Sequence, residues 1–357
     1  MRLVLAVCLA GLAVPAAAFS PLTEEEAGIL QIGLRNTADQ FVLPAYEAQA
    51  AAADELHAAL TDHCAGAAPR TPAEESFVAL FLAWQRASIV GLGPVMDAEG
   101  PMRVQLWPDP KGFSARAIRG ALREADPALL REGGLEGRSI ALTNLTALEH
   151  LLYGDLVAGT YGCDLAVAIA AFQADLAQNL VAAWRPGAPF RMSFDTAYAG
   201  NATFPDVDSA LRAFLAGAVV YTDRLRKFRL DRGLGADPGA ARPERTEAVA
   251  SGAGLASIAV SFRTLAELYD VPYGVFDAAP DMGGTMDYFV LAQTARSISE
   301  SLALEPRPLV EIAEEDGAGA AELRRLSGEV LFHERFLKTG FLDALGLVAG
   351  FTAADGD

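Results

Sequence analysis

The chain has 357 residues, a formal net charge of −18 and 52% hydrophobic residues. The acidic balance argues against nucleic acid and anionic membrane surfaces as partners, because like charges repel, and it is compatible with cations. Acidic charge is also common on ordinary soluble proteins, so it favours metal handling only weakly. A chain of this length and apolar content suits two domains rather than one.

The N-terminus has the pattern of a secretory signal peptide over residues 1–18. Arg2 supplies the positive charge, Leu3–Val14 the apolar stretch and Ala16–Ala18 a small-residue cleavage site. The apolar stretch is too short to span a bilayer, and no later stretch long enough to span one is free of charges. We expect cleavage near Ala18 and Phe19 and a periplasmic mature protein without a transmembrane segment.

The rest of the chain predicts an all-α protein. Alanine and leucine dominate, glycine and proline gather between periodic stretches, and alternating β-branched runs are scarce. The predicted helices, in chain order, are Thr23–Ala59 with a break or bend near Pro44, Pro72–Val90, Ser114–Ala125, Ser139–Tyr153, Leu165–Ala183, Val207–Leu230, Glu244–Tyr269, Asp281–Leu302, Gly319–Leu337 and Leu342–Gly350.

An irregular stretch divides this helical pattern in two. Residues 186–205 are rich in glycine, proline, phenylalanine and small polar residues and show no periodicity, so we expect a linker or a long ordered loop. It separates an N-terminal helical bundle, residues 19–185, from a C-terminal one, residues 206–357. Both halves contain paired long helices followed by turns.

Two cysteines remain once the signal peptide, which contains Cys8, is removed. An even pair in an exported protein favours a disulfide between Cys64 and Cys163. A metal–thiolate site is the poorer interpretation, because the chain has no C-x-x-C spacing.

The most informative segment is the predicted helix around Glu149. Leu145, Leu148 and Leu152 form one apolar stripe, and Glu149 falls on the same stripe. A carboxylate on a buried face is costly unless a metal, an arginine or a shared proton compensates it. Thr146 and Tyr153 lie one turn to either side and are expected to reach it. The structural alternative is a buried acid paired with an arginine such as Arg86.

This segment resembles the signature helix of the imelysin-like proteins, the peptidase M75 family. Their pattern is Gly-x-His-x-x-Glu followed by an aromatic, two apolar residues, an aromatic and glycine. Thr146 stands at the histidine position and Asn144 at the first glycine, while His150 follows the glutamate. The positions that fit are Glu149, Leu151, Leu152, Tyr153 and Gly154.

The resemblance extends over most of the chain and implies two related helical bundles that arose by duplication. Other matching segments are Phe41–Tyr46, Trp84 with Arg86, Gly93-Pro94, Trp107–Asp109 and the C-terminal residues 345–357. In the second half, a Glu-Ser-Trp-Arg-Ser-Gly pattern keeps Glu247, Ser251 and Gly252 but has Val249 and Ala250 at the tryptophan and arginine positions. The ligand-binding residues implied are Arg86, Thr146, Glu149, His150, Tyr153 and Ser251.

Three functions follow from the resemblance. The first is a periplasmic binding protein of iron uptake that holds a metal, a metal complex or a small ligand between the bundles. The second is an M75-type metallopeptidase, and the third a non-catalytic partner of other periplasmic iron-uptake proteins. Glu149 is the candidate metal ligand, for a weakly bound divalent metal or iron. We assign no catalytic residue and lean against an enzyme, because Thr146 replaces the motif histidine and no H-E-x-x-H motif occurs.

His333 and Glu329 are expected in a surface ion cluster.

Overall fold

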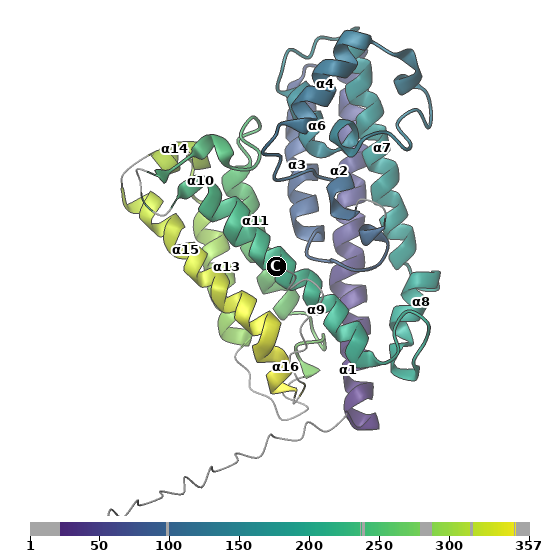
Figure 1. Ribbon diagram of the computed structural model, residues 1–357, viewed down its shortest axis with the longest axis vertical. Coiled ribbons are helices and arrows are strands. Elements are labelled where there is room, and N and C mark those ends of the chain that lie inside the picture. The colour runs from purple at the N-terminus through teal and green to yellow at the C-terminus, as the bar shows by residue number, and fades with distance from the viewer. Residues whose placement is uncertain are drawn as a thin grey trace, which may run out of the picture.

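The computed structural model describes residues 22–97, 100–235, 237, 240–278, 288–314, 317–345 and 347. Within these ranges the chain is helical and contains no strand, which confirms the predicted all-α class. The helices form two bundles that lie side by side (Figure 1). Their origin by duplication stays a prediction. The predicted signal peptide and residues 348–357 lie outside the described ranges.

The N-terminal bundle is built on three long helices. Helix α2 (Leu43–Cys64) packs between α3 (Thr71–Ala87) and α7 (Tyr161–Trp184). The short helices α4 (Phe113–Glu124), α5 (Ile140–Thr143) and α6 (Leu145–Leu152) cover one end of the bundle (Figure 1). Helix α1 (Glu24–Thr37) starts at a capping box, in which Thr23 and Glu26 satisfy each other's backbone amides.

The predicted bend near Pro44 corresponds to a local widening of the helix. A π-helical turn, Ala38–Val42, joins α1 to α2, and the two helices run on as one rod in Figure 1. Pro44 occupies the first turn of α2, directly after the π-helical turn. A proline is tolerated in the first turn of a helix, although it has no amide hydrogen to donate. The chain therefore passes the proline without a break.

Helix α7 is long and apolar enough to cross a membrane by length and composition alone, and half of that stretch is buried in the fold. It packs along α2 and against α6, and residues such as Leu165, Ile169 and Ala170 are fully buried in the core. We therefore interpret α7 as the central core helix of the N-terminal bundle.

The irregular stretch at residues 186–205 is ordered and partly helical. It contains α8 (Pro189–Asp195) and a 3-10 turn, Ala197–Ala199. The rings of Phe190 and Phe194 meet Trp184 edge-on, with centroid distances of 5.2 and 5.4 Å, and Phe204 packs on both phenylalanines. The segment is thus anchored to the end of α7 by an aromatic cluster.

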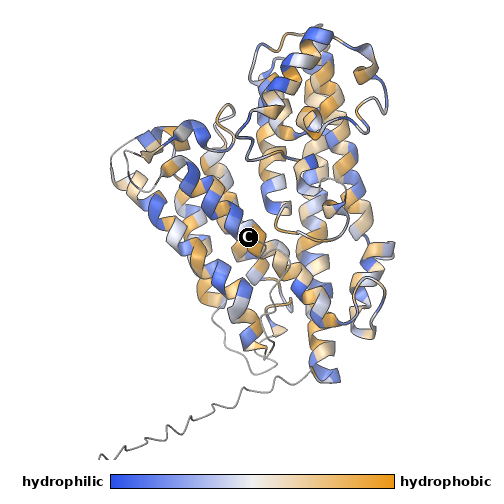
Figure 2. Cartoon of the chain, viewed as in Figure 1, coloured by the Kyte–Doolittle hydropathy of each residue, from blue (hydrophilic) through white to orange (hydrophobic). Residues whose placement is uncertain are grey.

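The C-terminal bundle comprises four longer helices, α9 (Val207–Arg224), α11 (Gly254–Tyr269), α13 (Tyr288–Ala303) and α15 (Ala318–Arg335). A π-helical turn (Leu225–Asp231) links α9 to α10 (Arg232–Leu234), and the shorter helices are α14 (Leu309–Glu314) and α16 (Phe341–Ala344). In both bundles, hydrophilic and hydrophobic residues occupy different sides of the helices (Figure 2). The predicted start of the helix at Asp281 and the end of the last one at Gly350 lie outside the described residues.

Two predicted helix boundaries were wrong. Helix α11 begins at Gly254 rather than Glu244, because Ala248 and Gly252 adopt positive φ angles of 52° and 71° and turn the preceding segment. The predicted helix Ser139–Tyr153 is interrupted at Asn144, whose extended backbone ends α5 and whose side chain accepts the amides of Thr146 and Ala147. These two breaks lie next to the segments that contain Glu149 and Ser251, whose side chains are in contact.

The two bundles share one hydrophobic core, and their backbones come into direct contact at a pair of glycines. Gly91 follows α3, and Gly217 lies within α9. A Cβ atom built on Gly217 would come within 2.4 Å of the Gly91 backbone nitrogen, and one on Gly91 within 2.6 Å of the Gly217 Cα. Only glycine fits at this backbone contact.

Replacing Gly217 with alanine is therefore expected to destabilise the protein by about 1–3 kcal/mol, the usual cost of overpacking a filled core. The matched control is Gly328→Ala, in the middle of α15, where an added Cβ has no neighbour within 4 Å. That control is expected to be neutral or to stabilise by up to about 1 kcal/mol, since alanine favours helix. Urea unfolding of both variants tests the contact, and equal effects would refute it.

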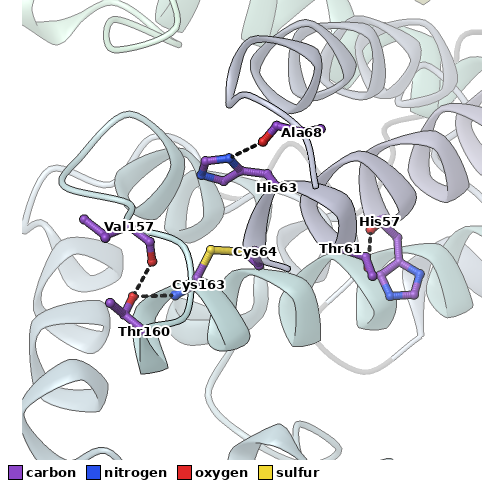
Figure 3. Close-up of a disulfide and its surroundings, with 8 residues drawn as sticks. All are labelled: His57, Thr61, His63, Cys64, Ala68, Val157, Thr160 and Cys163. Carbon is purple, nitrogen blue, oxygen red and sulfur yellow. Dashed lines mark hydrogen bonds between the residues drawn. A yellow bond between two sulfur atoms is a disulfide. The ribbon is translucent and has the colours of Figure 1, made fainter. Parts of the chain in front are cut away.

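The predicted disulfide is confirmed. Cys64 closes α2 and Cys163 lies in the first turn of α7, with Cα atoms 5.5 Å apart (Figure 3). Thr160 caps α7 beside it, and His63 contacts the Ala68 carbonyl at 3.2 Å. The bond ties two neighbouring core helices together at one end.

Candidate functional site

Glu149 projects from α6 of the N-terminal bundle to a turn of the C-terminal bundle. Its Oε1 atom accepts two hydrogen bonds from Ser251, one from the backbone nitrogen at 2.9 Å and one from the hydroxyl at 2.8 Å. Within the described part of the chain, Oε2 makes no hydrogen bond. The structure thus brings two of the predicted site residues together across the junction of the bundles.

The pKa of Glu149 is raised above its ordinary value of 4.5. Burial is the main cause, because it disfavours the charged form. The hydrogen bonds from Ser251 and the nearby His150 act in the opposite direction, and the negative charge of Glu247 raises the pKa further. Glu149 therefore holds its proton more readily than an exposed glutamate, and a cation at Oε2 would displace that proton.

Glu149 makes no hydrogen bond to the three predicted site residues nearest to it in sequence, Thr146, His150 and Tyr153. The Thr146 hydroxyl donates to the Leu106 carbonyl at 3.3 Å, and that of Tyr153 donates to the Glu74 carbonyl at 3.2 Å. Burial raises the pKa of Tyr153 to about 12, with further contributions from the charges of Glu74 and Glu149. His150 is exposed on the other side of the helix, as its position next to Glu149 predicts.

Arg86 is not the partner of Glu149, so the proposed structural pairing was wrong. Its Nε atom instead forms an ion pair with Glu267 of α11 at 2.8 Å, and its guanidinium lies over the Phe41 ring. Arg86 thus contacts α11 rather than the turn that binds Glu149. A sequence motif does not encode this choice of partner. Glu149 has only neutral donors, from Ser251, as direct partners within the described residues.

A buried polar network lies beside this contact, and the sequence analysis did not identify it. At its centre, Arg229 and Glu247 form an ion pair with an Nε–Oε2 distance of 3.0 Å, and both side chains are at most 5% exposed. Four further side chains from both bundles complete the hydrogen bonding: Gln85, Gln105, Ser257 and Ser261.

The network is arranged so that each charge is met by several polar groups. Gln105 donates to Glu247 Oε1 at 2.8 Å, and Arg229 donates to Ser261 at 2.7 Å and also to Gln85. Gln85 and Gln105 belong to the first bundle, whereas Arg229 and Glu247 belong to the second. The one sequence signal was the motif glutamate, Glu247, because Arg229 lies in a run of charged residues, 223–232, that does not mark it as buried.

The described residues contain no group of three or more histidine, cysteine, aspartate or glutamate side chains placed to hold a metal ion. Glu247 and Glu267 at the junction are paired with Arg229 and Arg86, which leaves Glu149 as the acidic donor without a cationic partner there among the described residues, and its metal-binding role stays a prediction. The donor set fits a metal that arrives with ligands of its own better than a bare ion.

The expected surface cluster around His333 was wrong. His333 is 1% exposed, and its Nδ1 lies 3.1 Å from the Tyr269 hydroxyl in the core of the second bundle. Burial lowers the pKa of His333 to about 4, so the imidazole stays neutral at physiological pH. Glu329 is instead paired with Arg325 on the surface.

Substituting Glu149 with glutamine is expected to raise the melting temperature at neutral pH. Because the pKa of Glu149 is raised on folding, the wild type loses stability as the pH rises through the folded pKa, and glutamine escapes that loss. The gain should shrink below the ordinary pKa of 4.5, where both states carry the proton. Calorimetry from pH 4 to 8 measures this, with the exposed Glu132→Gln as control. A lower melting temperature for Glu149→Gln at pH 7 would make Glu149 a structural acid.

The sequence profile of the imelysin family, peptidase M75, matches residues 42–303. The chain belongs to the imelysin family. The crystal structure of an imelysin-like protein from Psychrobacter arcticum 273-4 superimposes with a TM-score of 0.73, covering 93% of this chain and 99% of that one at 18% sequence identity. At that identity the match shows the shared fold. No curated protein matches this imelysin.

Proposed function

We propose that this imelysin is a periplasmic binding protein of iron uptake that holds a metal complex at Glu149, between its two bundles. The observation that carries the proposal is the Oε2 atom of a partly buried carboxylate at the junction of the bundles, which makes no hydrogen bond within the described residues. Buried carboxylates with a raised pKa and a free oxygen are costly to a fold, and such costs are concentrated at functional sites.

A metal complex fits this site better than a bare ion. Protein-only sites for first-row metals need three or four nitrogen, oxygen or sulfur ligands. Here the described chain offers one carboxylate oxygen, together with the Ser251 hydroxyl that already donates to the other oxygen. A chelate supplies the remaining ligands, and Glu149 would add a single hard oxygen of the kind ferric iron accepts.

The donor set argues against the peptidase alternative. Hydrolysis by a metallopeptidase needs a metal-activated water and therefore a firmly held ion. Thr146 stands where the family motif has histidine, and its hydroxyl is engaged with the Leu106 carbonyl. The third function, a partner protein without a ligand, is separated from the first by direct binding measurements.

Titration calorimetry with ferric nitrilotriacetate tests the proposal, since this chelate leaves coordination positions open for a protein oxygen. We expect the wild type to bind the chelate and to bind Zn²⁺ only weakly. Thr146→His should raise Zn²⁺ affinity at least tenfold, because histidine and glutamate at i, i+3 then share a helix face. Thr203→His, on an exposed loop, controls for non-specific binding to an added imidazole.

Two outcomes would contradict the proposal. Failure of the wild type to bind the chelate favours the partner-protein alternative. Tighter Zn²⁺ binding by the wild type than by Thr146→His would show that another donor, such as His150, completes a metal site.

A further inference from the structure

A separate cavity of about 320 Å³ lies between the bundles, on the side formed by α3, α9 and the π-helical turn that follows α9. None of the six predicted site residues lines it. Its wall includes Trp84 and Met96 from the first bundle and Val220, Tyr221, Arg224 and Arg229 from the second. We call it the Arg224 cavity. Its volume is at the lower end of the roughly 300–1,000 Å³ typical of small-molecule sites.

The cavity contains one arginine whose charge is not balanced. Arg229 is fully engaged, by Glu247, Ser261 and Gln85. Arg224 is only partly buried, and within the described chain it makes no ion pair and donates only to the Trp107 carbonyl, at 2.7 Å. Burial lowers its pKa, and the like charge of Arg229 lowers it further, with Glu247 acting in the opposite direction. An anion beside Arg224 would relieve this unfavourable environment.

A second unsatisfied group lies in the same wall. Tyr221 is 2% exposed, and its buried hydroxyl has no hydrogen-bond partner among the residues that the structure describes. A buried hydroxyl without a partner is unfavourable, so native structures seldom contain one unless a ligand or water completes it. The Tyr221 ring also carries the guanidinium of Arg229 over its face, at 5.4 Å from the ring centroid, which fixes the ring's position.

The remainder of the wall is mostly apolar, with Ser88 and Gln105 as its further polar side chains. Trp84 is buried, whereas Met96 and Val220 are 50% and 47% exposed. Exposed apolar side chains at the edge of a cavity suit a ligand with an apolar body. The cavity thus combines one unbalanced cation, one free hydroxyl and an apolar lining.

We propose that the Arg224 cavity binds a small organic carboxylate with an apolar body. The carboxylate would accept hydrogen bonds from the Arg224 guanidinium and the Tyr221 hydroxyl, a charge-assisted pairing. The apolar body would contact Trp84, Met96 and Val220. This site does not use Glu149, so it stands or falls independently of the proposed metal-complex site.

The test is titration calorimetry of the full mature protein with benzoate and with benzyl alcohol, its neutral analogue of similar size. Wild type is expected to bind benzoate at least tenfold more tightly than benzyl alcohol. Arg224→Gln should weaken benzoate binding at least tenfold, and Arg224→Lys less. The matched control, Arg212→Gln, removes an arginine from the same helix outside the cavity and should leave benzoate affinity unchanged.

Tyr221→Phe separates binding from structure. It removes a hydroxyl that makes no hydrogen bond to any described residue, so the melting temperature should not fall, while benzoate affinity should drop several-fold. Three results would overturn the proposal: no benzoate binding by the wild type, equal binding of benzyl alcohol, or benzoate binding that both Arg224→Gln and Tyr221→Phe leave intact.

Discussion

Replacing Glu247 with glutamine is expected to lower the free energy of unfolding by about 3–5 kcal/mol, the usual cost of leaving a buried charge without its partner. Glu247 is 2% exposed and Arg229 5%, so water cannot take over the lost interaction. Glutamine keeps the size of the side chain and one acceptor oxygen, but it removes the charge that balances Arg229. Guanidinium unfolding followed by circular dichroism measures the loss.

Two controls distinguish the buried charge from the loss of an ion pair in general. Arg325→Gln removes the surface pairs with Glu322 and Glu329 and should cost at most about 1 kcal/mol. The double variant Arg229→Met, Glu247→Met removes both charges and should cost less than Glu247→Gln alone. A loss below 1 kcal/mol for Glu247→Gln would show that Arg229 tolerates burial alone and that the network does not stabilise the junction.

Removing the disulfide is expected to have the second largest effect on stability. The bond joins residues separated by 99 positions, and a loop of that length corresponds to about 4–5 kcal/mol in the chain-entropy model, with about 2–5 kcal/mol usual in practice. The helical content should persist, because α2 and α7 also pack through fully buried core residues such as Leu60 and Leu165.

The comparison is between the wild type and Cys64→Ser, Cys163→Ser, each with and without a reductant. Reductant should lower the unfolding midpoint of the wild type to that of the double variant and leave the variant unchanged. Two free thiols in the oxidised wild type by mass spectrometry, or a midpoint insensitive to reductant, would contradict the assignment.

The regular elements of this fold were accessible from the sequence because they depend on local patterns. The spacing of Leu145, Leu148 and Leu152 predicts the buried face of α6, and the two cysteines that follow the predicted signal peptide predict the disulfide. The prediction of helix over residues 244–253 was wrong, because the conformation of this segment does not follow from local helix propensity. Ala248 favours helix, yet it adopts a positive φ directly after Glu247, whose side chain pairs with Arg229 across a long stretch of sequence.

The candidate site was predictable only in part, for the same reason. The motif glutamate and Ser251 were identified separately, and the structure joins them across 102 positions of sequence. Gln85 and Gln105, by contrast, have no pattern that marks them as buried, because their partners come from the other bundle. Arg86 was assigned to the wrong carboxylate because Glu149 and Glu267 are both plausible partners until the bundles are assembled.

The central claim is that Glu149 binds a metal complex, and titration of ferric nitrilotriacetate into wild type, Glu149→Gln and Glu267→Gln tests it most directly. Glu267 is a matched control, because it is a carboxylate at the same junction whose partner is Arg86. The account predicts that Glu149→Gln loses binding at least tenfold while remaining folded, and that Glu267→Gln binds like the wild type. Equal binding by wild type and Glu149→Gln would contradict it.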